Sequence, residues 1–241
     1  MDPLPPFHRA ALLLDMDGTL VDLAPTPDAV VVAPGLAATL AILRDALGGA
    51  LAIVTGRPVE TVDRLFGDAP GAVAGEHGGA IRHYFSGPIE RPDLAAPPAT
   101  WLAVADALVQ SFPGALLERK ARGFALHYRL APHARDVFYT ALSTMVAEAD
   151  GFQLHPAHML WEIRPRGVDK GDAVTALMQR APFAGRLPIF IGDDVTDEDG
   201  MRVCRELGGA GYRVDAVFRD PAGVRSWLHR SAQRGDWEPF V

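Results

Sequence analysis

The sequence predicts an α/β protein whose doubly wound, Rossmann-like core is interrupted by an inserted α+β domain. Short apolar runs alternate with longer segments of helical period in residues 1–84 and again in residues 166–241, which is the pattern of parallel βαβ units. Between them, residues 85–165 show helices and pairs of short strands, typical of an α+β domain. The length of 241 residues suits one to two domains of about 150 residues each.

The first half of the core is expected to contain three strands and two helices. Apolar runs predict strands at Ala10–Leu14, Leu51–Val54 and Ala72–Ala74. Pro34 and Gly35 open a predicted helix that runs to about Leu47, and Pro58 suits the first turn of the next helix.

The inserted segment begins with a proline-rich linker at Phe85–Pro98. Helical period predicts helices at Thr100–Phe112 and Pro132–Ala149. Two strand pairs are expected, the second of them turning at Pro156; their strands are Leu116–Arg119 with Phe124–Arg129, and Phe152–His155 with Met159–Arg164.

After Pro165 the alternating pattern of the core returns. Helices are predicted at Lys170–Gln179, Asp197–Leu207 and Ala222–Arg230. Leu187–Ile191 is an apolar strand, and Ala210–Val217 is an extended run.

Composition excludes several classes of protein. Lys and Arg number 23 against 30 Asp and Glu, a formal charge of −7, and such a surface disfavours nonspecific nucleic-acid binding. Cys204 is the one cysteine, so neither a disulfide framework nor a thiolate-rich zinc site can form. No apolar run is long enough for a signal peptide or a membrane span. A soluble, cytoplasmic protein is expected, and a monomer is compatible with the sequence.

Polar residues follow the first two predicted strands, at the edge where open α/β sheets bind ligands. Asp15 and Asp17 come directly after Ala10–Leu14 and make a concentrated negative site; a solvated Asp/Gly turn is the alternative. Thr55, Gly56 and Arg57 follow Leu51–Val54 and offer a hydroxyl and backbone amides to phosphate oxygens; a helix N-cap is the alternative.

A lysine and a crowd of carboxylates follow the insert. Lys170 opens a predicted helix, where its charge could neutralise a carboxylate and a phosphoryl group. Five carboxylates lie between Asp193 and Asp199, and they repel one another unless a cation or hydrogen-bond donors compensate. Oxygen ligands of this kind suit Mg²⁺ rather than zinc.

These groups, in this order, resemble the phosphohydrolases of the haloacid dehalogenase (HAD) superfamily, and the insert is similar to that superfamily's type-2 caps. Within the superfamily the chain looks like the trehalose-6-phosphate phosphatases. The matching strings are LDMDGTL at 14–20, GEHG at 75–78, ERK at 118–120 ahead of HYR at 127–129, WEIRP at 161–165 and GDDVTDE at 192–198.

The resemblance implies a role for each core residue in hydrolysing a small sugar phosphate. Asp15 is the expected nucleophile and Asp17 the expected proton donor and acceptor, with Thr55 and Lys170 also catalytic. The implied Mg²⁺ ligands are Asp15, the Asp17 carbonyl and Asp193. Asp194 and Asp197 are expected to orient the lysine or the metal's waters.

Substrate contacts are expected from both parts of the chain. In the core these are Gly56, Arg57 and His77, although a structural hydrogen bond explains His77 equally well. In the cap, Glu118 and Lys120 resemble sugar-hydroxyl ligands that face the core when the cap closes, with Glu162 a further candidate. An exposed strand of alternating charge is the alternative for Glu118–Lys120.

Three other functions share some of these features. A phosphatase for sucrose phosphate, glucosylglycerol phosphate or mannosyl-phosphoglycerate would keep the chemistry and change the sugar. A sugar phosphomutase would use the same two aspartates but return the phosphoryl group to sugar. A noncatalytic sensor would only bind a sugar phosphate.

Overall fold

A computed structural model describes residues 4–240. Contacts divide the described residues into two compact units, one of residues 4–24, 29–91 and 168–240 and the other of residues 25–28 and 92–167. We refer to them as the core and the cap. The expected boundaries were 84/85 and 165/166. A bridge between Ile81 and Glu90, with both backbone hydrogen bonds at 2.8 Å, connects residues 85–91 to the core, and the cap unit runs to residue 167.

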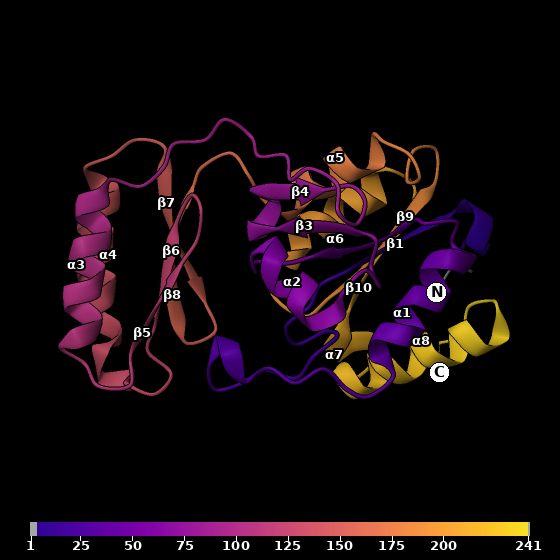
Figure 1. The fold of residues 1–241 in the computed structure, drawn as a ribbon, viewed down its shortest axis with the longest axis horizontal. Coiled ribbons are helices and arrows are strands. Elements are labelled where there is room, and N and C mark those ends of the chain that lie inside the picture. The colour runs from indigo at the N-terminus through magenta and orange to yellow at the C-terminus, as the bar shows by residue number, and fades with distance from the viewer. Residues whose placement is uncertain (1–3, 241) are drawn as a thin grey trace. The chain divides into compact units, whose positions relative to one another are not determined.

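The core contains a six-stranded sheet in the order β10-β9-β1-β2-β3-β4 (Figure 1). Five strands are parallel, and β4 pairs antiparallel with β3. The strands are β1 (Ala10–Leu14), β2 (Leu51–Val54), β3 (Ala72–Gly75), β4 (Ala80–Arg82), β9 (Leu187–Gly192) and β10 (Ala210–Arg213).

Helices cover both faces of this sheet, which makes the core doubly wound. The helices are α1 (Leu36–Ala46), α2 (Val59–Phe66), α5 (Lys170–Met178), α6 (Asp197–Glu206), α7 (Val214–Val217) and α8 (Pro221–Arg234). Leu12 and Leu14 of β1 pack with residues of α1, α2 and α8, whereas Ala11 and Leu13 pack with residues of α5 and α6. All four side chains are fully buried, as expected for a central parallel strand with both faces covered.

The cap contains a four-stranded antiparallel sheet in the order β5-β6-β8-β7, with two helices on one face (Figure 1). Its elements are α3 (Ala99–Gln110), β5 (Leu116–Arg119), β6 (Phe124–His127), α4 (Arg135–Ala147), β7 (Phe152–Ala157) and β8 (Leu160–Pro165). Phe124, Leu126 and Ile163 alternate onto the helix-covered face and join Phe138 of α4 in the cap's hydrophobic core. The residues between them point to the opposite, polar face.

The fold class is therefore confirmed, whereas two local expectations were wrong and one strand was missed. Pro156 does not form the turn of the second cap pair but lies within β7 opposite Trp161, because β7 is an edge strand where the missing N–H is tolerated. Ala210–Val217 is extended only as far as Arg213, after which α7 begins. The short antiparallel strand β4 was not predicted at all.

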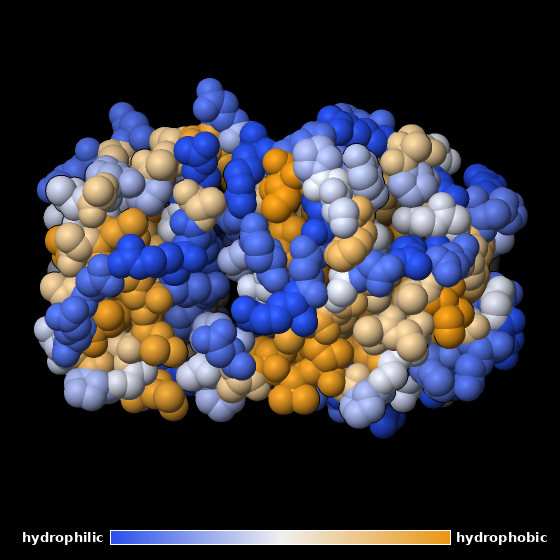
Figure 2. Space-filling model, in the orientation of Figure 1, coloured by the Kyte–Doolittle hydropathy of each residue, from blue (hydrophilic) through white to orange (hydrophobic). Residues whose placement is uncertain are grey.

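Four single turns of 3₁₀-helix complete the described elements: η1 (Phe7–Arg9), η2 (Pro27–Ala29), η3 (Glu76–Gly78) and η4 (Pro132–Ala134). Of the helices in residues 4–240, none has the length and apolar character that a membrane crossing requires. Figure 2 shows hydrophilic residues spread over both units on the side drawn.

Candidate active site

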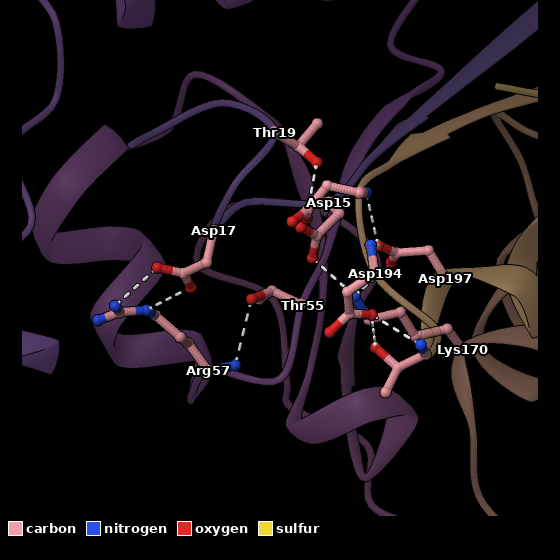
Figure 3. Close-up of polar contacts among 10 residues, drawn as sticks. Asp15, Asp17, Thr19, Thr55, Arg57, Lys170, Asp194 and Asp197 are labelled. Carbon is pink, nitrogen blue, oxygen red and sulfur yellow. Dashed lines mark hydrogen bonds and ion pairs between the residues drawn. The ribbon is translucent and has the colours of Figure 1, made fainter. Parts of the chain in front are cut away.

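Three neighbouring strands of the core bring the predicted chemical groups to one edge of the sheet. β2 and β9 lie on either side of β1, so the loops that follow their carboxyl ends meet there. This is the position at which doubly wound sheets bind ligands, because the chain leaves the central strand in opposite directions. Asp15 follows β1 and Thr55 follows β2 (Figure 3). Asp193 follows β9.

Asp15 is tied to a buried lysine. The Lys170 Nζ lies 2.7 Å from Asp15 Oδ1 and 2.5 Å from Asp197 Oδ1 (Figure 3). The three side chains are at most 5% exposed. Burial, followed by the charge of Asp197, raises the pKa of Asp15 well above its ordinary value, although Lys170 acts against this. The two carboxylates in turn raise the pKa of Lys170 despite its burial, so the ammonium stays charged.

Lys170 is placed by the first turn of α5. Asp169 is the N-cap residue, and its carboxylate accepts hydrogen bonds from the amides of Gly171 at 2.7 Å and Asp172 at 3.0 Å. The Asp172 carboxylate reaches back to the Asp169 amide and completes a capping box. This cap was not predicted, although the Asp-x-x-Asp spacing around Lys170 is a signal of it in the sequence.

Asp197 organises the loop after β9. While its Oδ1 accepts from Lys170, its Oδ2 accepts from the backbone amides of Asp193 at 2.9 Å and Asp194 at 3.0 Å. Asp194 is held separately, by the amide and hydroxyl of Thr196 at 2.7 and 2.6 Å. Burial alone would raise the pKa of Asp194, but the charge of Lys170 and the Thr196 hydrogen bonds outweigh it and lower that pKa.

Asp193 is the least compensated of these carboxylates. Its carboxylate accepts from the Thr19 hydroxyl at 3.4 Å, and the Arg213 guanidinium donates to its backbone carbonyl at 2.6 Å. Burial, followed by the charges of Asp197 and Asp194, raises the pKa of Asp193 to about 6. Thr19 and Arg213 were not predicted; Arg213 comes from β10, and nothing in its local sequence marks this contact.

A divalent cation fits this part of the site. Oxygen atoms of Asp15, Asp193 and Asp197 all lie within 4.8 Å of one another. Since Lys170 already pairs with Asp15 and Asp197, the surplus negative charge lies around Asp193. A hard cation with oxygen ligands such as Mg²⁺ would compensate it.

Gly18 allows the loops after β1 and β9 to approach this closely. It adopts a left-handed φ of +79°, and a Cβ at this position would overlap the Asp193 carboxylate. A glycine is therefore needed here both for the backbone conformation and for the space.

The loop after β2 carries Thr55, Gly56 and Arg57, and the loop after β3 supports it. The Arg57 amide donates to the Thr55 hydroxyl at 3.2 Å. The His77 amide donates to the Thr55 carbonyl at 3.0 Å, and a Cβ on Gly56 would lie 2.5 Å from His77 Nε2. His77 thus packs directly against Gly56.

Asp17 does not join the Asp15 cluster but pairs with Arg57. The Arg57 Nε and Nη2 donate to the two Asp17 carboxylate oxygens at 2.6 and 2.8 Å. Figure 3 shows these two side chains directed toward each other, with Thr55 between them and the Lys170 cluster in this view.

The three predicted cap residues share the polar face of the cap sheet. Glu118 on β5 and Glu162 on β8 both stand opposite Ala125 of β6, a small residue that leaves space between them. Lys120 Nζ lies 2.6 Å from Glu162 Oε1, and His127 Nε2 lies 2.8 Å from Glu118 Oε2. His127 was not predicted as a site residue.

The cap glutamate Glu118 is kept ionised by its neighbours. Burial would raise its pKa, but the hydrogen bond with His127 and the charge of Lys120 prevail and lower it. An anionic carboxylate can accept hydrogen bonds from hydroxyl groups, and a neighbouring lysine ammonium can donate to them, which is the chemistry of a sugar site.

Comparisons with known proteins agree with this chemistry. The family model described as trehalose-phosphatase matches residues 13–225. The chain is 44% identical over 229 residues to a probable trehalose-phosphate phosphatase of Sinorhizobium fredii, covering 93% of this chain and 85% of the relative. It is 38% identical over 207 residues to the trehalose-6-phosphate phosphatase of Escherichia coli K12, covering 86% and 77%.

Solved structures show the same fold. The C-terminal domain of Candida albicans trehalose-6-phosphate phosphatase matches with a TM-score of 0.76 at 21% identity, over 94% of this chain and 93% of that one. The fold also matches phosphatases of the HAD superfamily. The resemblance seen in the sequence is thereby confirmed: this chain belongs to the trehalose-phosphatase family and has the fold of the HAD phosphatases.

Proposed function

We propose that this chain hydrolyses trehalose 6-phosphate to trehalose and inorganic phosphate, with Mg²⁺ as cofactor and an aspartyl-phosphate on Asp15 as intermediate. The observation that carries the proposal is the buried Asp15–Lys170 pair at the carboxyl end of β1, 2.7 Å apart, beside Asp193 and the Thr55 loop. The activity for which the relatives are named supports trehalose 6-phosphate as the sugar ester.

Two displacements at phosphorus account for the reaction. In the first, an Asp15 carboxylate oxygen bonds to phosphorus, the ester P–O bond breaks, and Asp17 gives a proton to the departing sugar oxygen. In the second, water bonds to phosphorus while Asp17 takes its proton, the bond to Asp15 breaks, and phosphate leaves. The protein returns to its starting state, and one water is consumed for each ester.

The remaining core groups stabilise charge on the phosphoryl oxygens. Lys170 and Thr55 donate to them, together with the Gly56 amide, as charge redistributes in the transition state. Asp197 orients Lys170 and, through its second oxygen, the amides of Asp193 and Asp194.

The donor set suits a magnesium ion. Asp15, Asp193 and the Asp17 backbone carbonyl would hold Mg²⁺, which when bound offsets the negative charge of the phosphoryl group and its nucleophile. Asp193 carries the least compensated charge of the cluster, and burial raises its pKa to about 6. A cation bound there would offset that charge, which supports this assignment.

The cap supplies sugar recognition. Glu118, Lys120 and Glu162 lie on one polar face of the cap sheet. Their carboxylates can accept hydrogen bonds from the many hydroxyls of an uncharged disaccharide, and the lysine can donate to them. We assign Gly56, Arg57 and His77, which lie in the loops after β2 and β3, to the phosphate end of the substrate.

A panel of phosphate esters tests the proposal. With Mg²⁺, kcat/KM for released phosphate should be highest for trehalose 6-phosphate and much lower for sucrose 6-phosphate, glucosylglycerol phosphate, mannosyl-phosphoglycerate and glucose 6-phosphate. Chelation with EDTA should abolish turnover and added Mg²⁺ restore it. Equal rates for trehalose 6-phosphate and glucose 6-phosphate would refute the substrate, and an isomeric sugar phosphate with little free phosphate would indicate a mutase.

A further inference from the structure

Arg57 forms a bidentate ion pair with the carboxylate of Asp17. Its Nε donates to Asp17 Oδ2 at 2.6 Å and its Nη2 donates to Oδ1 at 2.8 Å. The paired side chains are 14% and 29% exposed. A fork of this kind fixes both the position and the plane of a carboxylate, which a single contact to lysine cannot do.

The backbone of Arg57 is held by hydrogen bonds on both sides. Arg57 follows β2 and Asp17 follows the adjacent strand β1, where Leu14 stands opposite Ile53. The Arg57 carbonyl accepts from the Glu76 amide at 3.0 Å, and its amide donates to the Thr55 hydroxyl. Contacts within the loop after β2 and with the loop after β3 therefore hold the backbone from which Arg57 reaches Asp17.

The direction in which the Asp17 side chain points matters for an in-line displacement. Attack by Asp15 on phosphorus requires the leaving oxygen on the opposite side of the phosphoryl group. The side chain of Asp17 points away from the Asp15–Lys170–Asp197 cluster toward Arg57, and Thr55 lies between the two groups in Figure 3. The phosphoryl group would thus enter between Asp15 and Asp17.

From this geometry we infer that Arg57 is a positioning residue: it holds Asp17 on the leaving-group side, where Asp17 exchanges its proton with the ester oxygen and then with water. The inference rests on the proposed hydrolysis. It differs from the expectation that Arg57 binds substrate, because here Arg57 acts through Asp17.

Because Arg57 contacts both carboxylate oxygens of Asp17, one contact can hold Asp17 in place while the other oxygen carries a proton. The protonated oxygen gives up its Arg57 hydrogen bond, and the second oxygen keeps its own. When the ester P–O bond breaks, the proton passes from Asp17 to the sugar oxygen and both hydrogen bonds re-form. The attacking water later returns a proton to Asp17.

Leaving groups of graded acidity test the inference. Wild type, Arg57→Gln and Arg57→Lys are compared with trehalose 6-phosphate, phenyl phosphate and p-nitrophenyl phosphate. Because p-nitrophenolate leaves without a proton, Arg57→Gln should lower its kcat/KM less than about tenfold, against roughly 10²–10⁴-fold for trehalose 6-phosphate. The loss of kcat/KM for phenyl phosphate should lie between these two values. On each ester, Arg57→Lys should lie between the wild type and Arg57→Gln. An equal loss on all three esters with raised KM would overturn the inference, since Arg57 would then bind the phosphoryl group itself.

A double-mutant cycle gives a second readout that a merely structural role would not produce. If Arg57 acts through Asp17, Asp17→Asn and Asp17→Asn with Arg57→Gln should have the same kcat for trehalose 6-phosphate within about twofold, whereas additive losses would contradict the inference. Arg82→Gln is the matched control. Arg82 of β4 also forms a two-point ion pair, through Nη1 and Nη2 with Asp63 of α2, at 2.5 and 2.6 Å. Its loss should lower Tm without discriminating among the esters.

The outcomes for the wild type separate this inference from the substrate assignment. If the wild type hydrolyses the aryl esters but not trehalose 6-phosphate, the proposed substrate fails, and the comparison of phenyl with p-nitrophenyl phosphate still decides the role of Arg57. A wild type that hydrolyses none of the esters would overturn the proposed hydrolysis and this inference with it.

Discussion

Replacing Lys170 with methionine removes a buried positive charge and keeps a side chain of similar length. In the native chain the Lys170 ammonium lies 2.7 Å from Asp15 and 2.5 Å from Asp197. Those two carboxylates are 5% and 0% exposed, so water cannot replace the missing cation. The variant therefore retains two buried negative charges that repel each other.

The expected loss of stability is large. Removing one partner of a buried ion pair costs about 3–5 kcal/mol, because the remaining charge stays buried without compensation. For a chain of this size that loss lowers Tm by roughly 6–20 °C. By comparison, Arg202→Met removes a surface pair with Glu206, whose side chains are 54% and 59% exposed, and should leave Tm nearly unchanged because solvent screens the pair.

The deficit of the Lys170→Met variant should depend on pH. Burial already raises the native-state pKa of Asp15 and Asp197, and loss of Lys170 removes the charge that opposes this. A carboxyl with a raised native pKa binds protons more tightly in the folded state, so the variant gains stability as pH falls from 8 to 5. The Lys170 pKa is raised in the wild type, so its contribution is constant across this range.

Urea unfolding followed by tryptophan fluorescence, in EDTA at pH 8 and pH 5, measures both effects. The double variant Lys170→Met with Asp197→Asn should recover part of the loss, because the amide oxygen can still accept from the backbone while the repelling charge is gone. A loss below about 1 kcal/mol that is the same at both pH values would refute the electrostatic account of this cluster.

Three further predictions concern single positions. Gly18→Ala should weaken Mg²⁺ binding by at least about tenfold in calorimetry, because the added Cβ displaces Asp193. Gly35→Ala, at a φ of +80° with open space around it, is the control, and equal effects of the two variants on Mg²⁺ binding would contradict the reasoning. Burial raises the pKa of Cys204 to about 12, so a disulfide reagent at pH 8 should modify it only after denaturation; rapid reaction of the native chain would disprove this. Lys120→Ala should lower kcat/KM for trehalose 6-phosphate by about 10–100-fold and leave p-nitrophenyl phosphate nearly unchanged, whereas equal losses would exclude a sugar contact.

The main features of the fold could be predicted from the sequence because the core strands are simple apolar runs. Ala10–Leu14 and Leu51–Val54 are continuous buried segments, and both have the predicted bounds. Ala80–Arg82 was missed because a strand of three residues has no recognisable period and forms only by pairing with β3. Pro156 was misassigned because its tolerance in β7 depends on that strand being at the edge.

The candidate site was predictable where its residues follow strands in short motifs. Asp15 and Asp193 could be recognised in this way, since a strand end gives each a known place in the fold. Their partners could not, because they come from distant segments: Arg213 reaches Asp193 from β10, and His127 reaches Glu118 across the cap sheet. The pairing of Arg57 with Asp17 likewise appears only when β1 and β2 lie side by side.

Trapping the covalent phosphoryl intermediate tests the central claim most directly. Rapid acid quench after mixing with trehalose 6-phosphate and Mg²⁺, followed by borohydride reduction and peptide mass spectrometry, locates any acyl phosphate. We predict a single phosphorylated residue, Asp15, and none in Asp15→Asn, which should keep its fold but lose at least about 10³-fold of its turnover. Turnover without a phosphorylated residue, or phosphate on a different side chain, would contradict the account.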